Sequence, residues 1–419
     1  MFKGSQVFVY LFFLVTTLLS SNSSLTAQAK TLDDYTNAAL KNSPVLKDYY
    51  GQIEQNRIDS TSTNANYKPQ VNFTGQALTA PKYGNYGYDD AISNGGSYEA
   101  YVSVTQQIAP RKEINANRKL SNIAHQSLSN QAKQTELQLR KDVADKYLAV
   151  CLLQQQRVFI LQSDSFLVRE LTVLKAFTEK GIYKVSDYYE LLVEEQSEHT
   201  QIAQLNLQLS QSFSDLNETC GIIDTASYEL NIPKIEAYRQ NDYKQLNGFQ
   251  KFQVDSMQFV FQNQLLDAQY NPHLSWYADA GMEASQPNLI YRSFGNSIGL
   301  NLSIPIYDGH KRDLKHRSLK ISDNIRSNYE GFFVQTYNTH TGMLAKQIED
   351  MAKLIIQIRK EEEQVNKWKK VNEVQLEAGN ISVTDFLLSI RKELEVKNNI
   401  AQAMINQQQL QNEFNYWNH

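Results

Sequence analysis

The chain has 419 residues, of which 41% are hydrophobic and 21% are charged, and its formal net charge is −4. This charge argues against a nucleic-acid partner, because proteins that bind nucleic acids are normally basic. Two cysteines are too few for a scaffold held together by disulfides. No later run approaches about 18 consecutive apolar residues, so any part that crosses a membrane is expected to consist of strands.

Residues 1–29 have the pattern of a secretory signal peptide. Lys3 provides a short positive region, an apolar run follows over Val7–Leu19, and Ala27–Ala29 reads as a small-residue cleavage site. We therefore expect an exported protein whose mature chain begins near Lys30. No cysteine follows the cleavage site, so a lipid anchor is not expected there.

An internal repeat organises the rest of the chain. Gly181–Tyr188 aligns with Gly379–Phe386 at an offset of 198 residues, and Pro69–Phe73 resembles Pro272–Trp276 at an offset of 203 residues. The five-residue difference falls where a loop between two strands is expected. The sequence therefore predicts a duplicated unit.

Each copy is predicted to contain a strand pair followed by a long α-hairpin, with N-terminal helices over Thr31–Ala65. The predicted boundaries are 30–218 for the first repeat (strand pair at about 69–108, hairpin at about 111–218), 219–270 for a linking side domain, and 271–419 for the second repeat (strand pair at about 272–306, hairpin at about 309–417).

Apolar and polar residues alternate in the predicted strands. The apolar positions are Leu274, Trp276, Ala278, Ala280, Met282, Ile298, Leu300, Leu302, Ile304 and Ile306 in the second copy, and more weakly Val71, Phe73, Ala100, Val102 and Val104 in the first. Aromatic residues gather around the strand ends: Tyr83, Tyr86, Tyr88, Tyr98, Trp276, Tyr277, Tyr291 and Phe294. This pattern is typical of membrane barrel strands, although a half-buried strand of a soluble sheet also shows the alternation.

Four strands cannot close a barrel within one chain, since about eight strands form the smallest barrel. Open sheet edges are not tolerated in lipid. We therefore expect the chain to oligomerise, with each chain adding four strands to a shared barrel. A dimer would have eight strands and a trimer twelve, and this argument leaves the number open.

The regions 111–232 and 306–419 contain no proline, which predicts unusually long helices. The chain is expected to turn at Gly181 and at Gly379. In the second region, apolar residues recur in a pattern typical of a coiled-coil seam: Ile348, Met351, Ile355, Ile358, Val365 and Trp368.

An aspartate follows each turn, Asp187 in the first hairpin and Asp385 in the second. Ser186 and Thr384 are suitable N-caps, and an acid in the first helical turn is favoured by the helix dipole. The same carboxylates would favour cations if they lined a pore. Both roles stay open.

Basic residues cluster after each strand pair: Arg111, Lys112, Arg118 and Lys119 in the first repeat, and Lys311, Arg312, Lys315, His316, Arg317 and Lys320 in the second. Cations at a helix start oppose the helix dipole, so compensation is expected. Phospholipid head groups would provide it at the membrane boundary. The alternative is a solvated helix face paired with Glu113 or Asp313.

The sequence gives no support for catalysis, for a cofactor or for a metal site. The seven histidines (125, 199, 273, 310, 316, 340 and 419) form no HExxH motif and no paired metal-ligand spacing. A glycine-rich phosphate loop and a local Ser-His-Asp motif are also missing. Cys151 and Cys220 are interpreted as buried free thiols, with a single bridge between them as the alternative.

Three segments together resemble the TolC family of outer-membrane efflux and secretion channels. They are Thr31–Asp34 with Ala39–Pro44, then Leu302–Gly309 with Arg312, and finally Glu377–Gly379 with Thr384–Leu387. The Leu302–Gly309 segment is the most characteristic of the three. The resemblance covers essentially the whole mature chain.

The resemblance implies a homotrimer in the cell outer membrane, with an α+β fold in which a twelve-stranded β-barrel continues into a long periplasmic α-helical barrel. It implies a passive exit duct of a tripartite efflux or type I secretion system, working with a periplasmic adaptor and an inner-membrane pump of the RND or ABC type. The implied site residues are Gly181, Asp187, Gly379 and Asp385 at a periplasmic tip, and Pro305, Tyr307, Asp308 and Gly309 at the exit from the membrane strands.

The chain departs from the family at the gate. Leu388 stands where the family carries a second carboxylate, and Leu376 and Ile381 stand where it carries the tyrosine and arginine that hold the gate closed. We therefore do not expect those polar contacts here. The alternative function is a periplasmic coiled-coil adaptor without a membrane barrel, against which the alternating strands argue.

Overall fold

The computed structural model describes residues 30–89, 96–224, 228–239 and 241–419. The predicted signal peptide lies outside the described residues. Among the residues that are described, no helix is long and apolar enough to cross a membrane. The described residues divide into two compact units: a hairpin unit that they form within Met1–Asn42, Arg140–Glu236 and Gln347–Asn412, and a sheet unit within Ser43–Leu139, Ala237–Lys346 and Glu413–His419. Each unit combines parts of both repeats.

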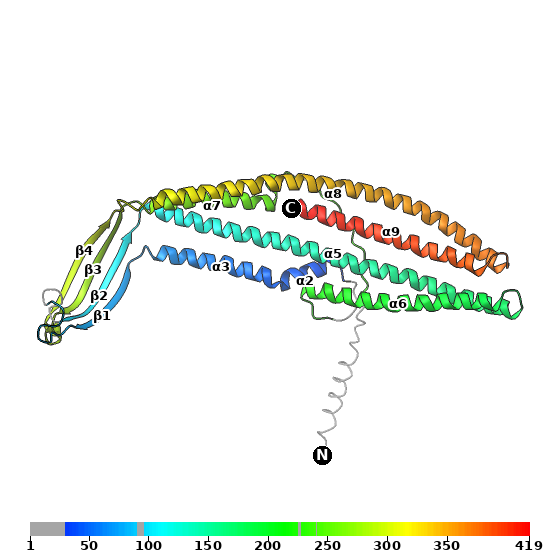
Figure 1. The fold of residues 1–419 in the computed structure, drawn as a ribbon, viewed down its shortest axis with the longest axis horizontal. Helices are drawn as coiled ribbons and strands as arrows, with labels where there is room; N and C mark the ends of the chain where they lie inside the picture. The colour runs from blue at the N-terminus through cyan, green and yellow to red at the C-terminus, as the bar shows by residue number, and fades with distance from the viewer. Residues whose placement is uncertain (1–29, 90–95, 225–227, 240) are drawn as a thin grey trace, which may run out of the picture. The chain divides into compact units, whose positions relative to one another are not determined.

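The sheet unit contains one antiparallel sheet of four strands in the order β1-β2-β3-β4 (Figure 1). The strands are β1 (Gln70–Thr79), β2 (Gly96–Ile108), β3 (His273–Ala284) and β4 (Phe294–Ser303). Val71 pairs with Val104, and Val104 pairs with Ala278. The strand pairs of the two internal repeats therefore join edge to edge in the middle of the sheet. A short 3-10 helix, η2 (Pro287–Arg292), lies in the loop between β3 and β4.

Alternation along each strand gives the sheet two different faces, as the sequence predicts. Directly paired residues point to the same side of a sheet. One face carries Asn72, Ser103, Asp279 and Ser297, and the other carries Phe73, Val102, Ala280 and their apolar neighbours. The sheet is therefore amphipathic.

A helix leads into each strand pair of the sheet unit. Helix α3 (Pro44–Ala65) precedes β1 and helix α7 (Asn247–Ala268) precedes β3, at the same offset of 203 residues as Pro69 and Pro272. In the first repeat, Ser43 is the N-cap of α3, and its Oγ accepts the Leu46 N–H at 3.3 Å. The predicted linker 219–270 therefore contains a helix that belongs to the second repeat, which begins earlier than residue 271.

Aromatic packing fixes the start of α7 within the sheet unit. Leu246, Phe249 and Tyr337 form a buried cluster, with Phe333 and Trp417 packed against it. The Tyr337 hydroxyl contacts two oxygens, Asn241 O at 3.0 Å and Asn418 Oδ1 at 2.9 Å. The Asn247 N–H donates to His419 O at 2.8 Å. A 3-10 turn, η1 (Tyr243–Gln245), precedes the helix.

Two long helical hairpins dominate the rest of the chain: α5 (Arg111–Glu179) with α6 (Val185–Cys220), and α8 (Lys311–Glu377) with α9 (Val383–Trp417) (Figure 1). In the hairpin unit, α2 (Leu32–Asn42) packs beside α6, and Asn42 Nδ2 donates to Cys220 O at 3.0 Å. The predicted fold class, long α-hairpins with four strands per chain, is confirmed.

The predicted seam on α8 is partly confirmed within the hairpin unit. Ile355, Ile358 and Val365 are buried against Val396 and Ala403 of α9. Trp368, which the heptad pattern placed in the same seam, is instead 39% exposed. Near Trp368 the ion pair Lys369–Glu393 at 2.6 Å joins the two helices. Apolar contact between them resumes at Leu376.

Both cysteines are free and buried in the hairpin unit, as predicted. Burial raises the pKa of the Cys151 thiol to about 12 and that of the Cys220 thiol to about 11. Near Cys151, the rings of Tyr147 and of Tyr35 in α2 make a T-shaped contact, with centroids 5.8 Å apart. These thiols serve as small packing residues.

Candidate functional site

The two hairpin turns are built alike, and both require glycine. Gly181 has φ +76° and Gly379 has φ +70°, in the left-handed region that side chains disfavour. The N–H after each glycine bonds back to the helix in the Schellman pattern. The two bonds are Ile182 N to Phe177 O at 2.9 Å and Asn380 N to Gln375 O at 2.8 Å.

Both predicted tip aspartates cap the returning helices. Asp187 Oδ2 accepts the Lys184 N–H at 3.2 Å. Asp385 and Ser382 contact one another twice, with Ser382 Oγ donating to Asp385 Oδ2 at 2.7 Å and accepting the Asp385 N–H at 3.1 Å. These bonds hold each carboxylate beside its turn, where it also complements the helix dipole.

The predicted N-caps, Ser186 and Thr384, are wrong. The helices begin earlier, at Val185 and Val383, so both residues already lie inside the first turn. Thr384 Oγ1 instead donates to Glu190 of α6 at 2.9 Å. The first turn of one hairpin is thereby joined to the other hairpin.

Tyr183 makes a second link between the two turns. Its hydroxyl lies 2.8 Å from Leu376 O and 3.3 Å from Ile381 O. Leu376 and Ile381 are the two positions at which the sequence departs from the family that it resembles. Both contact Tyr183 through their backbone carbonyls.

Beneath the turns, the two hairpins share an apolar cluster. It contains Phe166, Leu167, Leu174, Leu191, Leu376, Val383, Phe386, Leu387 and Ile390, with Tyr183 and Ile381 packed against it. Arg391, which follows Ile390 of this cluster, forms a bidentate ion pair with Glu194 of the other hairpin, at 2.9 and 2.5 Å. Leu388, in contrast, is 56% exposed.

One buried carboxylate lies close to this cluster. Glu170 lines a small pocket with Phe177, Tyr183 and Leu376. Burial, followed by the charges of Glu373 and Glu377, raises the pKa of Glu170. The group is therefore ionised only at a cost to the folded state.

At the predicted strand exit, Asp308 lies just before the long helix α8 and accepts a hydrogen bond from its first turn. Its Oδ2 accepts the Tyr270 hydroxyl at 2.6 Å and the Arg312 N–H at 2.8 Å. The hydrogen bond from Tyr270 lowers the pKa of Asp308. Gly309 has φ +67°, while Tyr307 is exposed and Pro305 lies just beyond β4.

Two members of the basic cluster at this helix start, Arg312 and His316, pair with a carboxylate of another helix. Arg312 Nη2 pairs with Asp267 of α7 at 2.7 Å, and His316 Nε2 lies 3.1 Å from the same carboxylate. Asp313, the local partner that the sequence offers for this basic face, lies 3.8 Å from His310. Lys311 and Lys315 are exposed.

The polar face of the sheet is hollowed. The hollow has a volume of about 540 Å³ and carries three acids, Glu99, Asp279 and Glu283. The opposite face is apolar and uncovered within the described residues: Phe73 is 72% exposed, Ile298 82% and Leu300 72%. The unpaired edges of β1 and β4 bound this face in the described part of the chain.

No family model matches the sequence, and no curated protein matches it. Solved structures are similar over most of the chain. One is the outer membrane protein VceC of Vibrio cholerae, with 11% identity, 92% of this chain and 96% of that chain covered, and a TM-score of 0.76.

Two other structures match over a similar share of this chain. The Campylobacter jejuni CmeC outer membrane channel has 12% identity, coverage of 93% of this chain and 86% of that chain, and a TM-score of 0.76. The open state of the Neisseria gonorrhoeae MtrE outer membrane channel has 11% identity, coverage of 92% and 88%, and a TM-score of 0.74. At these identities the likeness shows the fold.

We expect Tyr183→Phe to loosen the turn at Gly379. The variant keeps the ring packing but removes the hydroxyl that donates to Leu376 O. Amide hydrogen exchange of residues 376–385 should accelerate by roughly fivefold or more, equivalent to about 1 kcal/mol for one hydrogen bond. Tyr189→Phe, at an exposed position of α6, is the control; equal exchange in both variants would refute the link.

Glu170→Gln should raise the melting temperature at pH 7. The pKa of Glu170 is raised in the folded state, so its ionisation destabilises the fold at any pH above that pKa. The penalty disappears as the pH falls below the ordinary value of 4.5, and the two melting curves should converge there. The exposed Glu179→Gln serves as control, and a gain of the same size in both would contradict the assignment.

Proposed function

We propose that this chain, which has the fold of the TolC-family outer-membrane channels, is the outer-membrane exit duct of a tripartite efflux or type I secretion system. The observation that carries the proposal is the amphipathic four-stranded sheet with its exposed apolar face. The chain works as a passive conduit, and a periplasmic adaptor and an inner-membrane pump of the RND or ABC type supply the energy.

The apolar face fits hydrocarbon better than water. Large side chains such as Phe73, Ile298 and Leu300 stand on one side of the sheet, while the acids Asp279 and Glu283 stand on the other. Soluble monomers rarely expose contiguous apolar patches of this kind. Lipid on the outside and water in the lumen would satisfy both faces.

The unpaired edges require further copies of the chain. In lipid, the N–H and C=O groups along β1 and β4 need partners, and β1 of one copy can pair with β4 of the next. Three copies give about twelve strands, enough to leave a water-filled lumen. The family resemblance implies three copies, a homotrimer.

The tip residues fit a constriction that favours cations. In a trimer, Asp187 and Asp385 would place six carboxylates at one level of the duct, each held beside its turn by capping bonds. We assign contact with the adaptor to the same turns. An adaptor function for this chain itself is disfavoured, because it would leave the apolar sheet face without a role.

Ile298→Lys should block assembly in the membrane, whereas Ser297→Lys should not. A lysine on the lipid side near the membrane midplane costs about 2–4 kcal/mol. A lysine at 297 instead stays on the polar face beside Asp279, which Ser297 contacts at 3.1 Å. The measurement is the yield of heat-modifiable trimers from outer-membrane fractions and their conductance in planar bilayers.

Equal trimer yields from the two variants would show that the apolar face does not meet lipid. A wild-type protein that stays a soluble monomer without conductance would refute the channel function itself.

Asp385→Asn should lower cation selectivity with little change in stability. The amide oxygen still accepts the Ser382 hydroxyl, so only the charge is removed. The reversal potential in a salt gradient should move toward zero. Asp350→Asn, at an exposed site on α8, is the charge-matched control. Unchanged selectivity at 385 would leave that aspartate with the capping role alone.

A further inference from the structure

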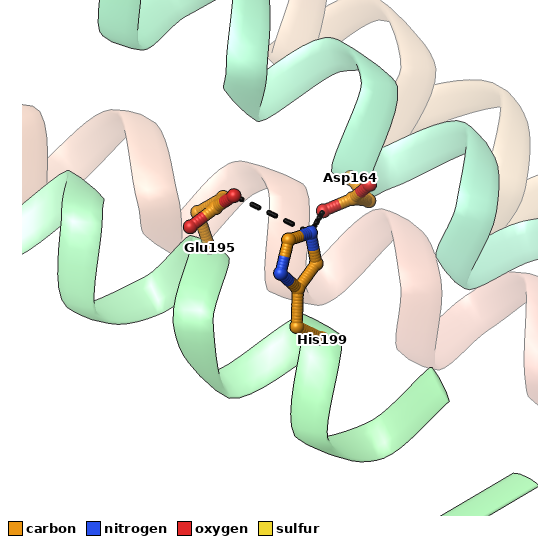
Figure 2. Close-up of side chains that lie close together, drawn as sticks. All are labelled: Asp164, Glu195 and His199. Atoms are coloured by element: carbon orange, nitrogen blue, oxygen red, sulfur yellow. Dashed lines mark ion pairs between the residues drawn. The ribbon is translucent and has the colours of Figure 1, made fainter. Parts of the chain in front are cut away.

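Three potential metal-binding side chains meet within the hairpin unit, away from the tip turns. Asp164 comes from α5, and Glu195 and His199 come from adjacent turns of α6 (Figure 2). His199 Nε2 lies 3.1 Å from Asp164 Oδ1 and 3.3 Å from Glu195 Oε1. One donor atom from each of the three residues lies within 4.8 Å of the other two.

An ion pair explains only part of this arrangement. A single imidazole nitrogen carries at most one proton, so it can direct a hydrogen bond at only one of the two carboxylates. Asp164 Oδ1 is shielded from solvent and receives no well-directed hydrogen bond from any described residue. A buried acceptor without a directed donor is costly to the fold.

The separations match those between ligands on one ion. Zinc binds imidazole nitrogen and carboxylate oxygen at about 2.0–2.2 Å, which places neighbouring ligands of a tetrahedral site roughly 3.3 Å apart. The two separations at His199 are 3.1 and 3.3 Å. Small side-chain rotations would therefore bring all three donors to one centre.

Charge and ligand type select the cation. Two carboxylates and a neutral imidazole carry a charge of −2, which a divalent ion neutralises. A nitrogen donor disfavours Ca²⁺ and Mg²⁺, and the lack of sulfur disfavours Cu(I). The Glu195 side chain is 10% exposed and that of His199 is 51% exposed, so the centre has a buried side and a side open to solvent.

We propose that Asp164, Glu195 and His199 form a binding site for a divalent transition-metal ion of the zinc type, which bridges α5 to α6. The remaining coordination positions face solvent on the His199 side and hold water. Binding to the folded hairpin, where the helices are already in register, stabilises it by mass action. The site goes beyond the proposed duct function and does not depend on it.

The test is zinc binding by the purified full chain in detergent, after removal of metal with a chelator. Titration against a chromophoric zinc indicator should give one tight site per chain, and zinc should raise the melting temperature. His199→Asn and Asp164→Asn should each weaken binding at least about tenfold, the lower bound expected even for supporting residues of a metal site. Both variants should also lose the zinc-dependent rise in melting temperature.

His316→Asn is the matched control, because His316 contacts a single carboxylate, Asp267, and an amide, Asn263. It should bind zinc as the wild type does. Cobalt provides an independent readout, since the wild type and the control should give visible absorption bands that the two site variants lack. Equal zinc affinity in the wild type and the His199→Asn variant, or no tight site in the wild type, would overturn the proposal and leave a surface ion pair.

Discussion

A sheet edge presents a row of N–H and C=O groups, and hydrocarbon contains nothing that can bond them. This constraint governs a chain whose only sheet among the described residues has four strands, with β1 and β4 unpaired on their outer sides. On the proposed duct function, the apolar face would enter lipid only when another copy supplies the missing partners. That function therefore couples membrane insertion to assembly.

At the tip, apolar packing and a hydroxyl bonded to backbone carbonyls join the two hairpins, beside the side-chain pairs Thr384–Glu190 and Arg391–Glu194. Leu376 is buried in the shared cluster while its carbonyl lies within hydrogen-bonding distance of the Tyr183 hydroxyl. A carbonyl acceptor does not depend on the side chain at its position, so this contact is compatible with an apolar residue there. The hydrogen bonds of Asp187 and Asp385 hold the local helix starts, so their charges are placed by the backbone that they cap.

The sequence predicts those features that appear as a local pattern of residues. Alternation revealed the strands and their two faces, and the glycine turns revealed the hairpins. It did not reveal that α7 repeats α3, because the matching offset of 203 residues is obscured by dissimilar side chains. The two returning helices begin at Val185 and Val383, earlier than the sequence predicts. The reason is that the turns end at Lys184 and Ser382 and not at Ser186 and Thr384.

Side-chain contacts between residues far apart in the sequence are harder to predict than the helices and strands. His199 and Glu195 are four residues apart on one helix face, but Asp164 reaches them only across the hairpin, and no local spacing encodes that approach. The Arg312–Asp267 pair has the same origin, since it joins two helices.

The two buried thiols have a practical consequence for labelling this protein. A thiol whose pKa is raised to about 12 or about 11 holds almost no thiolate at neutral pH, and thiolate is the form that reacts. Cys151 and Cys220 should thus remain silent toward maleimides and toward oxidants. A reporter cysteine placed at Ile182 or Asn380 would then be the one labelled position, which makes the native chain a ready background for spectroscopic distance measurements between tips.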